Sequence, residues 1–149
     1  MFKGIMNRGI SIKSIWEDEP LFEVKVSGSN GTFSGEANCY TLRSEISKFA
    51  ESISGYPASL DHTVNFSSGP SDTHSYFECS FSPTHLTAHF KVRVKIVHIV
   101  VYTNRPREHA ITEFDFNIEA AAVDRFTNSL RAVAGGVLGE AEAILSAKT

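Results

Sequence analysis

Histidines are the residues of this chain best suited to chemistry, because neutral imidazole binds metals and exchanges protons near neutral pH. The six are His62, His74, His85, His89, His98 and His109. His85 and His89 are four residues apart, which on a helix would place both on one face for a shared metal. Leu-Thr-Ala separates them in a pattern that predicts a strand, where residues four apart lie about 13 Å from each other. One metal ion cannot span that distance, so we expect surface histidines and no metal site.

Motifs for nucleophilic catalysis and phosphate binding do not occur in the sequence. There is no Gly-x-Ser-x-Gly elbow and no glycine-rich loop followed by Lys-Ser or Lys-Thr. Gly135, Gly136 and Gly139 come after a predicted helix instead of between a strand and a helix. We therefore expect no cofactor and predict that the protein is not an enzyme. The alternative is an enzyme whose site assembles from distant residues, such as His62 or His74 with a carboxylate from another strand.

A basic stripe follows one face of a predicted strand, and it consists of His89, Lys91, Arg93 and Lys95. It could bind phosphate, but Glu113 and Asp115 are expected on the same face of the neighbouring antiparallel strand. Opposite charges paired across strands contribute roughly 0.2–1 kcal/mol each. The formal net charge of −3 gives no further reason to expect nucleic acid. We predict cross-strand ion pairs and no nucleic-acid partner.

Two charged clusters are the candidates for binding a protein. One is Trp16, the only tryptophan, with the acids Glu17, Asp18 and Glu19 that follow it. Tryptophan beside charge is a common composition of interface hot spots. The other is a short basic loop of Arg105, Arg107 and His109, which has no interleaved aromatic residues to stack bases. We predict that both clusters contact a protein partner, whereas the plainer interpretation makes the acids a solvated strand connection.

Length and composition indicate one soluble domain over residues 1–149. The chain is 42% hydrophobic and 21% charged, and it is long enough to bury a core without a disulfide or metal. Its apolar content excludes a disordered chain. Cys39 and Cys79 fall at inward-facing strand positions, so we expect two free thiols in a reducing compartment. We find no signal peptide or membrane-spanning stretch, and we expect a cytoplasmic protein without membrane contact.

Alternating hydrophobic residues predict strands in most of the first 118 residues. Strands at residues 22–26 and 33–39 flank Asn30-Gly31, a pair typical of hairpin turns. Further strands are predicted at residues 64–66, 77–81, 86–96 and 114–118. The alternation breaks at Val97-His98-Ile99, which indicates either a bulge or a strand covered on both faces. His98 is expected to be a hydrogen-bonded histidine of the core.

Helical spacing appears in three segments. Leu42, Ile46, Phe49 and Ile53 share one stripe of a helix over residues 42–54. Thr41 is its expected N-cap and Gly55 its end. A second helix begins near Ala120, carries Val123, Phe126, Leu130 and Val133 on one stripe, and stops at Gly135-Gly136. Residues 138–147 are predicted to form a short terminal helix.

Together these elements predict an α+β fold. Its expected architecture is a mostly antiparallel sheet of six or seven strands, with two or three helices packed on one face.

The order of segments resembles a known family. Phe33-Ser34-Gly35-Glu36 leads into the helix at 42–53, then Phe77-Glu78-Cys79 and residues 86–94 follow, and Phe116-Asn117-Ile118-Glu119 precedes Val123, Phe126 and Leu130. Over residues 21–134 this is similar to small bacterial proteins that include immunity proteins of contact-dependent, cell-wall-associated toxin systems. The family pattern has no catalytic motif, and no residue role can be carried over. The chain departs from it in the extension over residues 135–149 and in its mild acidic charge.

The resemblance implies a bacterial, cytoplasmic protein that binds and neutralises a cognate toxin domain. The alternative to such a binding module is homo-oligomer assembly through an exposed edge strand or through residues 138–145. Val137, Leu138, Ile144 and Leu145 need a cover, which the same chain could also supply.

Overall fold

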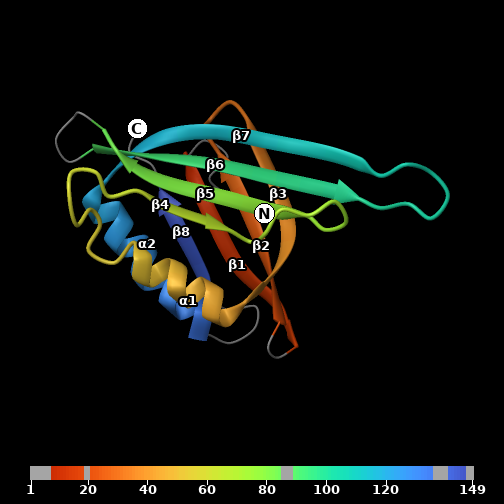
Figure 1. Ribbon diagram of the computed structural model, residues 1–149, viewed down its shortest axis with the longest axis horizontal. Coiled ribbons are helices and arrows are strands. Elements are labelled where there is room, and N and C mark those ends of the chain that lie inside the picture. The colour runs from red at the N-terminus through yellow and green to blue at the C-terminus, as the bar shows by residue number, and fades with distance from the viewer. Residues whose placement is uncertain (1–7, 19–20, 85–88, 136–140, 147–149) are drawn as a thin grey trace.

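A computed structural model describes residues 8–18, 21–84, 89–135 and 141–146 of the chain. Within them the elements run β1 (Gly9–Asp18), β2 (Leu21–Ser29), β3 (Ser34–Leu42), α1 (Arg43–Ser52), β4 (Val64–Ser67), β5 (Tyr76–Pro83), β6 (His89–Val100), β7 (Glu108–Glu119), α2 (Ala120–Gly135) and β8 (Glu142–Ser146) (Figure 1). The α+β class and the antiparallel pairing are therefore confirmed. In the described residues no helix has the length and apolar character that crossing a bilayer requires.

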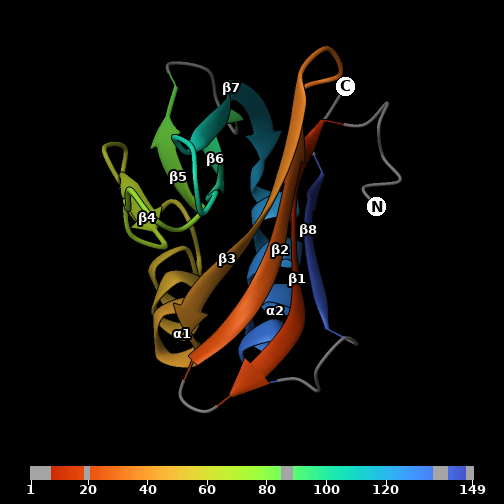
Figure 2. The same ribbon diagram turned by 90° about the vertical axis from the view of Figure 1, so that its right-hand side faces the viewer.

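The strands form two sheets of four, ordered β3-β2-β1-β8 and β4-β5-β6-β7, and every pair is antiparallel. The expectation of one sheet with six or seven strands is wrong in this respect. Each hairpin is visible in the local pattern, but the assignment of hairpins to sheets depends on long-range pairing, which alternation does not encode. Figure 2 shows the two sheets as separate layers, with both helices on the same side of β3-β2-β1-β8.

The last strand corrects a predicted helix. Residues 142–146 form β8, which pairs with β1 through Ile10 opposite Leu145 and Ile12 opposite Ala143. Ala143 and Leu145 are fully buried between exposed neighbours, which is the two-residue period of a strand. The chain thus covers Leu145 itself, whereas Ile144 is 46% exposed, and residues 137–140 and 147 lie outside the described residues.

The two helices confirm the predicted stripes from Ile46 to Ile53 and from Val123 to Val133, but Leu42 lies before α1 and is exposed, so its predicted place on the first stripe is wrong. α1 is preceded by Leu42 as its N-cap, without a side-chain hydrogen bond, and Thr41 is instead a buried residue of β3. α1 ends earlier than predicted, at Ser52 with Ile53 as its C-cap, and Gly55 lies in the turn that follows with a φ of 68°, which favours glycine. α1 packs on α2, and α2 packs on β8 and β1.

The helices are joined to the second sheet by aromatic contacts around Phe49 of α1. Its ring stacks on Phe66 at 4.4 Å between centroids, and its centroid lies 6.1 Å from those of Phe81 and Phe126. These partners belong to β4, β5 and α2. Phe49 therefore connects elements from distant parts of the sequence.

β3 of the first sheet passes close to β7 of the second sheet at Gly35. A Cβ added to Gly35 would lie 2.1 Å from the hydroxyl oxygen of Thr112, so only glycine fits there. The Thr112 hydroxyl donates a hydrogen bond to the carbonyl oxygen of Ser34 at 3.2 Å. This contact fixes the end of the β2–β3 hairpin against the second sheet.

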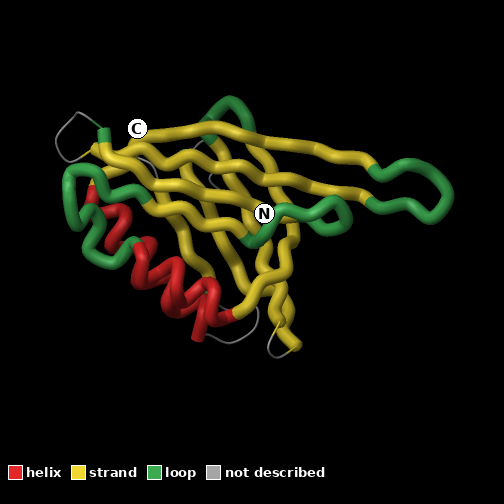
Figure 3. The backbone as a smooth tube through the Cα atoms, viewed as in Figure 1, coloured by secondary structure: helices red, strands yellow, loops and turns green. Residues whose placement is uncertain are grey.

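The hairpin of β6 and β7 extends past the other elements (Figures 1 and 3). Its register is continuous from His89 opposite Glu119 to Val100 opposite Glu108, so the predicted bulge is absent. The strand is covered on both faces at Ile96 and Val97, which point to opposite faces and are each 2% exposed, but this cover does not extend to position 98. His98 is exposed, and its predicted place in the core is wrong, because this end of the hairpin projects beyond the body that would cover it.

Candidate functional site

A register shift turns Trp16 outward. Ser14 lies opposite the buried Val24, but after the shift Trp16 lies opposite Glu23. In a regular strand Trp16 would share the inner face with Ser14, since side chains alternate, but the shift at Ile15 breaks this alternation. The bulge therefore places the only tryptophan on the outer face of the first sheet, where it is 43% exposed.

Three further apolar residues share this face. Tyr40 of β3 lies opposite Glu23, and Leu42 lies opposite Leu21. Trp16, Leu21, Tyr40 and Leu42 are 43%, 39%, 42% and 38% exposed, and we call these four residues the aromatic surface. Soluble proteins expose single apolar residues everywhere, but a contiguous group is typical of an interaction site.

The loop of residues 68–75 forms a wall beside the aromatic surface. A hollow of about 540 Å³ lies between them, lined by Trp16, Leu21, Tyr40, Ser68, Gly69, Ser71, His74 and Ser75. The His74 ring meets the Tyr40 ring edge-on, with 5.8 Å between centroids and 82° between planes. The Ser71 hydroxyl accepts hydrogen bonds from the backbone N–H of Thr73 and His74, both at 3.0 Å. These bonds fix the conformation of the loop, which positions the His74 ring against the Tyr40 ring.

The same loop reaches the predicted basic cluster. The Arg107 guanidinium lies 3.8 Å from the carboxylate of Asp72, and Ser75 accepts a hydrogen bond at 2.9 Å from the backbone N–H of Ile99. Arg105 lies over the ring of Tyr102, 3.7 Å from its centroid, and His109 is exposed. The loop thus connects the two predicted clusters, which are far apart in the sequence.

The acids predicted beside Trp16 are only partly described. The backbone of Glu17 lies opposite Phe22 and that of Asp18 lies opposite Leu21, whereas Glu19 is outside the described residues. Sequence reasoning missed Leu21, Tyr40, Leu42 and the wall. The polar position of Glu23 between Phe22 and Val24 marks the outer face of β2, but the register that brings Trp16 and Tyr40 beside it is not visible in the sequence.

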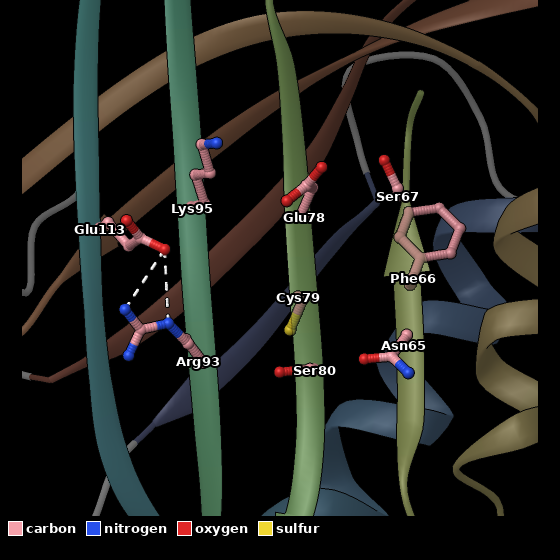
Figure 4. Close-up of a pocket in the computed structure, with 9 residues that line it drawn as sticks. All are labelled: Asn65, Phe66, Ser67, Glu78, Cys79, Ser80, Arg93, Lys95 and Glu113. Atoms are coloured by element: carbon pink, nitrogen blue, oxygen red, sulfur yellow. Dashed lines mark hydrogen bonds and ion pairs between the residues drawn. The ribbon is translucent and has the colours of Figure 1, made fainter. Parts of the chain in front are cut away.

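A second hollow lies on the outer face of the other sheet. Two rows cross its four strands, Ser67–Glu78–Lys95–Glu113 and Asn65–Ser80–Arg93–Asp115. All of these residues except Asp115 line a space of about 330 Å³, together with Phe66 and Cys79 (Figure 4). The predicted cross-strand pairs are confirmed: Arg93 lies 3.3 Å from both Glu113 and Asp115, and Lys91 lies 3.9 Å from Asp115. Because Arg93 already faces two carboxylates, this face attracts phosphate weakly.

The histidines that could assemble a catalytic site have local partners. The backbone N–H of Ala58 donates to Nδ1 of His62 at 2.9 Å, and Nδ1 of His74 bonds the Thr73 hydroxyl at 2.9 Å. Neither ring bonds a carboxylate within the described ranges, and no group of three metal-ligating side chains gathers in that part of the chain. His85 lies outside these ranges.

Both thiols are free and buried, as predicted. Burial raises the pKa of Cys39 to about 12, which outweighs a hydrogen bond with Ser68 that lowers it. Burial likewise raises the pKa of Cys79 to about 12. A nucleophilic thiol needs a lowered pKa and access to solvent, so both cysteines act as small apolar core residues.

The aromatic surface with its wall is thus the best candidate site, because the fold places exposed apolar side chains beside a hollow there. Its members come from β1, β2, β3 and the loop after β4. No family model, curated protein or solved structure matches this chain.

Proposed function

We propose that the protein is a non-enzymatic binding module that holds a protein partner on the aromatic surface. The observation that carries the proposal is the exposure of Trp16, Leu21, Tyr40 and Leu42 on one sheet face beside a hollow. Trp and Tyr are enriched at interface hot spots, because each buries a large area at low cost in side-chain entropy. At this end of the sheet β2 is paired with β1 on one side and with β3 on the other, which holds the four residues in place before binding.

The partner to test first is a bacterial toxin domain, which follows from the family resemblance. Arg105 and Arg107 lie at the end of the hairpin that the 68–75 loop connects to the aromatic surface. We assign them to the rim of the interface, where charges steer association and set its salt dependence more than its affinity. In this proposal the module acts in the cytoplasm, before the toxin reaches its target.

Affinity capture from source cells tests the proposal. The tagged chain is exposed to lysate and washed at about 0.5 M salt, where the Debye length is a few ångströms and purely electrostatic contacts are lost. We expect one stoichiometric protein to survive the wash. An Arg105→Ala/Arg107→Ala variant should retain it and bind it more slowly at low salt. An empty eluate from cells that express the protein would contradict the proposal and favour self-assembly or a hidden enzymatic site.

A further inference from the structure

One carboxylate stands between the two aromatic rings of the surface. Glu23 of β2 lies opposite Trp16 of β1 on one side and opposite Tyr40 of β3 on the other. These three residues therefore form one row across three strands, all on the outer face. Neighbouring strands are about 4.8 Å apart, so the Cα atoms of Trp16 and Tyr40 are about 10 Å apart with the carboxylate between them.

Glu23 has no hydrogen bond or ion pair with any described residue. The nearest cation along its own strand, Lys25, lies 3.7 Å from Glu36 and is thereby engaged. Glu23 is half-buried, which strengthens its interaction with a charge brought from outside. The row thus offers a negative charge that this part of the chain leaves without a partner.

Aromatic rings on both sides make the row selective for a cation. The faces of Trp and Tyr attract cations, and the attraction increases when the cation is desolvated. The Tyr40 ring is also in T-shaped contact with the His74 ring. A planar guanidinium suits such a row better than an ammonium, because it stacks on aromatic faces and binds a carboxylate through two parallel N–H donors.

We infer that Trp16, Glu23 and Tyr40 form a binding site for an arginine side chain of the protein partner. Glu23 accepts the hydrogen bonds of the guanidinium, and the two rings cover its faces and exclude water. The inference rests on the proposed function only for the source of the arginine, since the row is a property of this chain alone.

Trp16 makes the site directly observable, because it is the only tryptophan of the chain. Its fluorescence is titrated with Nα-acetyl-arginine methylamide, and in parallel with the citrulline analogue, which has the same shape without the charge. The lysine analogue is the third probe. We expect a saturable change with arginine, none with citrulline at the same concentrations, and weaker binding of lysine.

Variants identify the residues responsible. Glu23→Gln should weaken arginine binding about tenfold or more, since a charge-assisted hydrogen bond contributes roughly 1.5–3 kcal/mol. Tyr40→Leu should weaken it severalfold while keeping the apolar volume. Glu51→Gln, which changes an acid of α1 that already faces Arg131, is the matched control and should bind as the unmodified chain does. Thermal melting of each variant verifies its fold.

An equal response to citrulline, or unchanged affinity in Glu23→Gln, would overturn the inference, and tighter binding of lysine would overturn the choice of arginine. The proposed function fails separately. If the arginine probe binds and Glu23→Gln weakens that binding, but no partner is captured from cells, the arginine site is supported and the proposed function is contradicted. If a partner binds the aromatic surface but no arginine probe binds, this inference alone falls.

Discussion

Replacing Phe49 by alanine is expected to lower the free energy of unfolding by about 3–5 kcal/mol, the range for removing a buried phenylalanine. Phe49 is 2% exposed and contacts Phe66, Phe81 and Phe126. Those rings come from separate elements, so the cavity cannot close by shifting one helix. A loss of this size is a large part of the stability of a single domain.

Phe33→Ala is the matched control for this change. Phe33 is 67% exposed near the β2–β3 turn, and its replacement should change the free energy of unfolding by less than about 0.5 kcal/mol. Urea denaturation of both variants measures the difference. Equal effects of the two substitutions would mean that Phe49 does not join the helices to the second sheet.

Stability is also expected to fall steeply above pH 9 because of the two buried thiols. Burial raises the pKa of Cys39 and of Cys79 from 9.0 to about 12. Between these values the unfolded thiol has released its proton and the folded thiol still holds it, so the unfolded state binds fewer protons. Stability is then fully present below pH 9 and falls with rising pH by about 1.4 kcal/mol per pH unit for each thiol, up to about pH 12.

A Cys39→Ala/Cys79→Ala variant isolates this effect, because lysine and tyrosine titrations are common to both proteins. Urea denaturation in reducing buffer at pH 8, 9, 10 and 11 gives the free energy of unfolding of each. The lost volume lowers the stability of the variant by an amount independent of pH, whereas its decline above pH 9 should be shallower. Parallel curves would show that the thiols ionise at ordinary pKa values in the folded protein.

Elements with a strong local period could be predicted from the sequence. The stripe from Ile46 to Ile53 and the stripe from Val123 to Val133 give both helices, because one buried face imposes the helical period on each. The clear alternation in β2, β5, β6 and β7 gives their inward residues for the same reason. Gly55 marks the turn after α1 because its positive φ favours glycine.

Long-range pairing explains what could not be predicted. β8 has only two buried residues, Ala143 and Leu145, and its identity as a strand depends on β1, far away in the sequence. The division into two sheets depends likewise on partners chosen over long distances. Trp16 was predicted as a binding residue from its type, but its neighbours Tyr40 and Glu23 are defined by the strand register and by one bulge.

The affinity of the captured partner for a Trp16→Ala/Tyr40→Ala variant tests most directly whether the aromatic surface is the binding site. Truncating a hot-spot residue weakens the free energy of binding by about 2 kcal/mol or more. We therefore predict that the dissociation constant rises roughly 30-fold or more. Phe33→Ala/Leu60→Ala removes two apolar side chains that are 67% and 96% exposed elsewhere, and it should leave the constant unchanged. A dissociation constant that is the same for both variants and the unmodified chain would contradict the proposed binding surface.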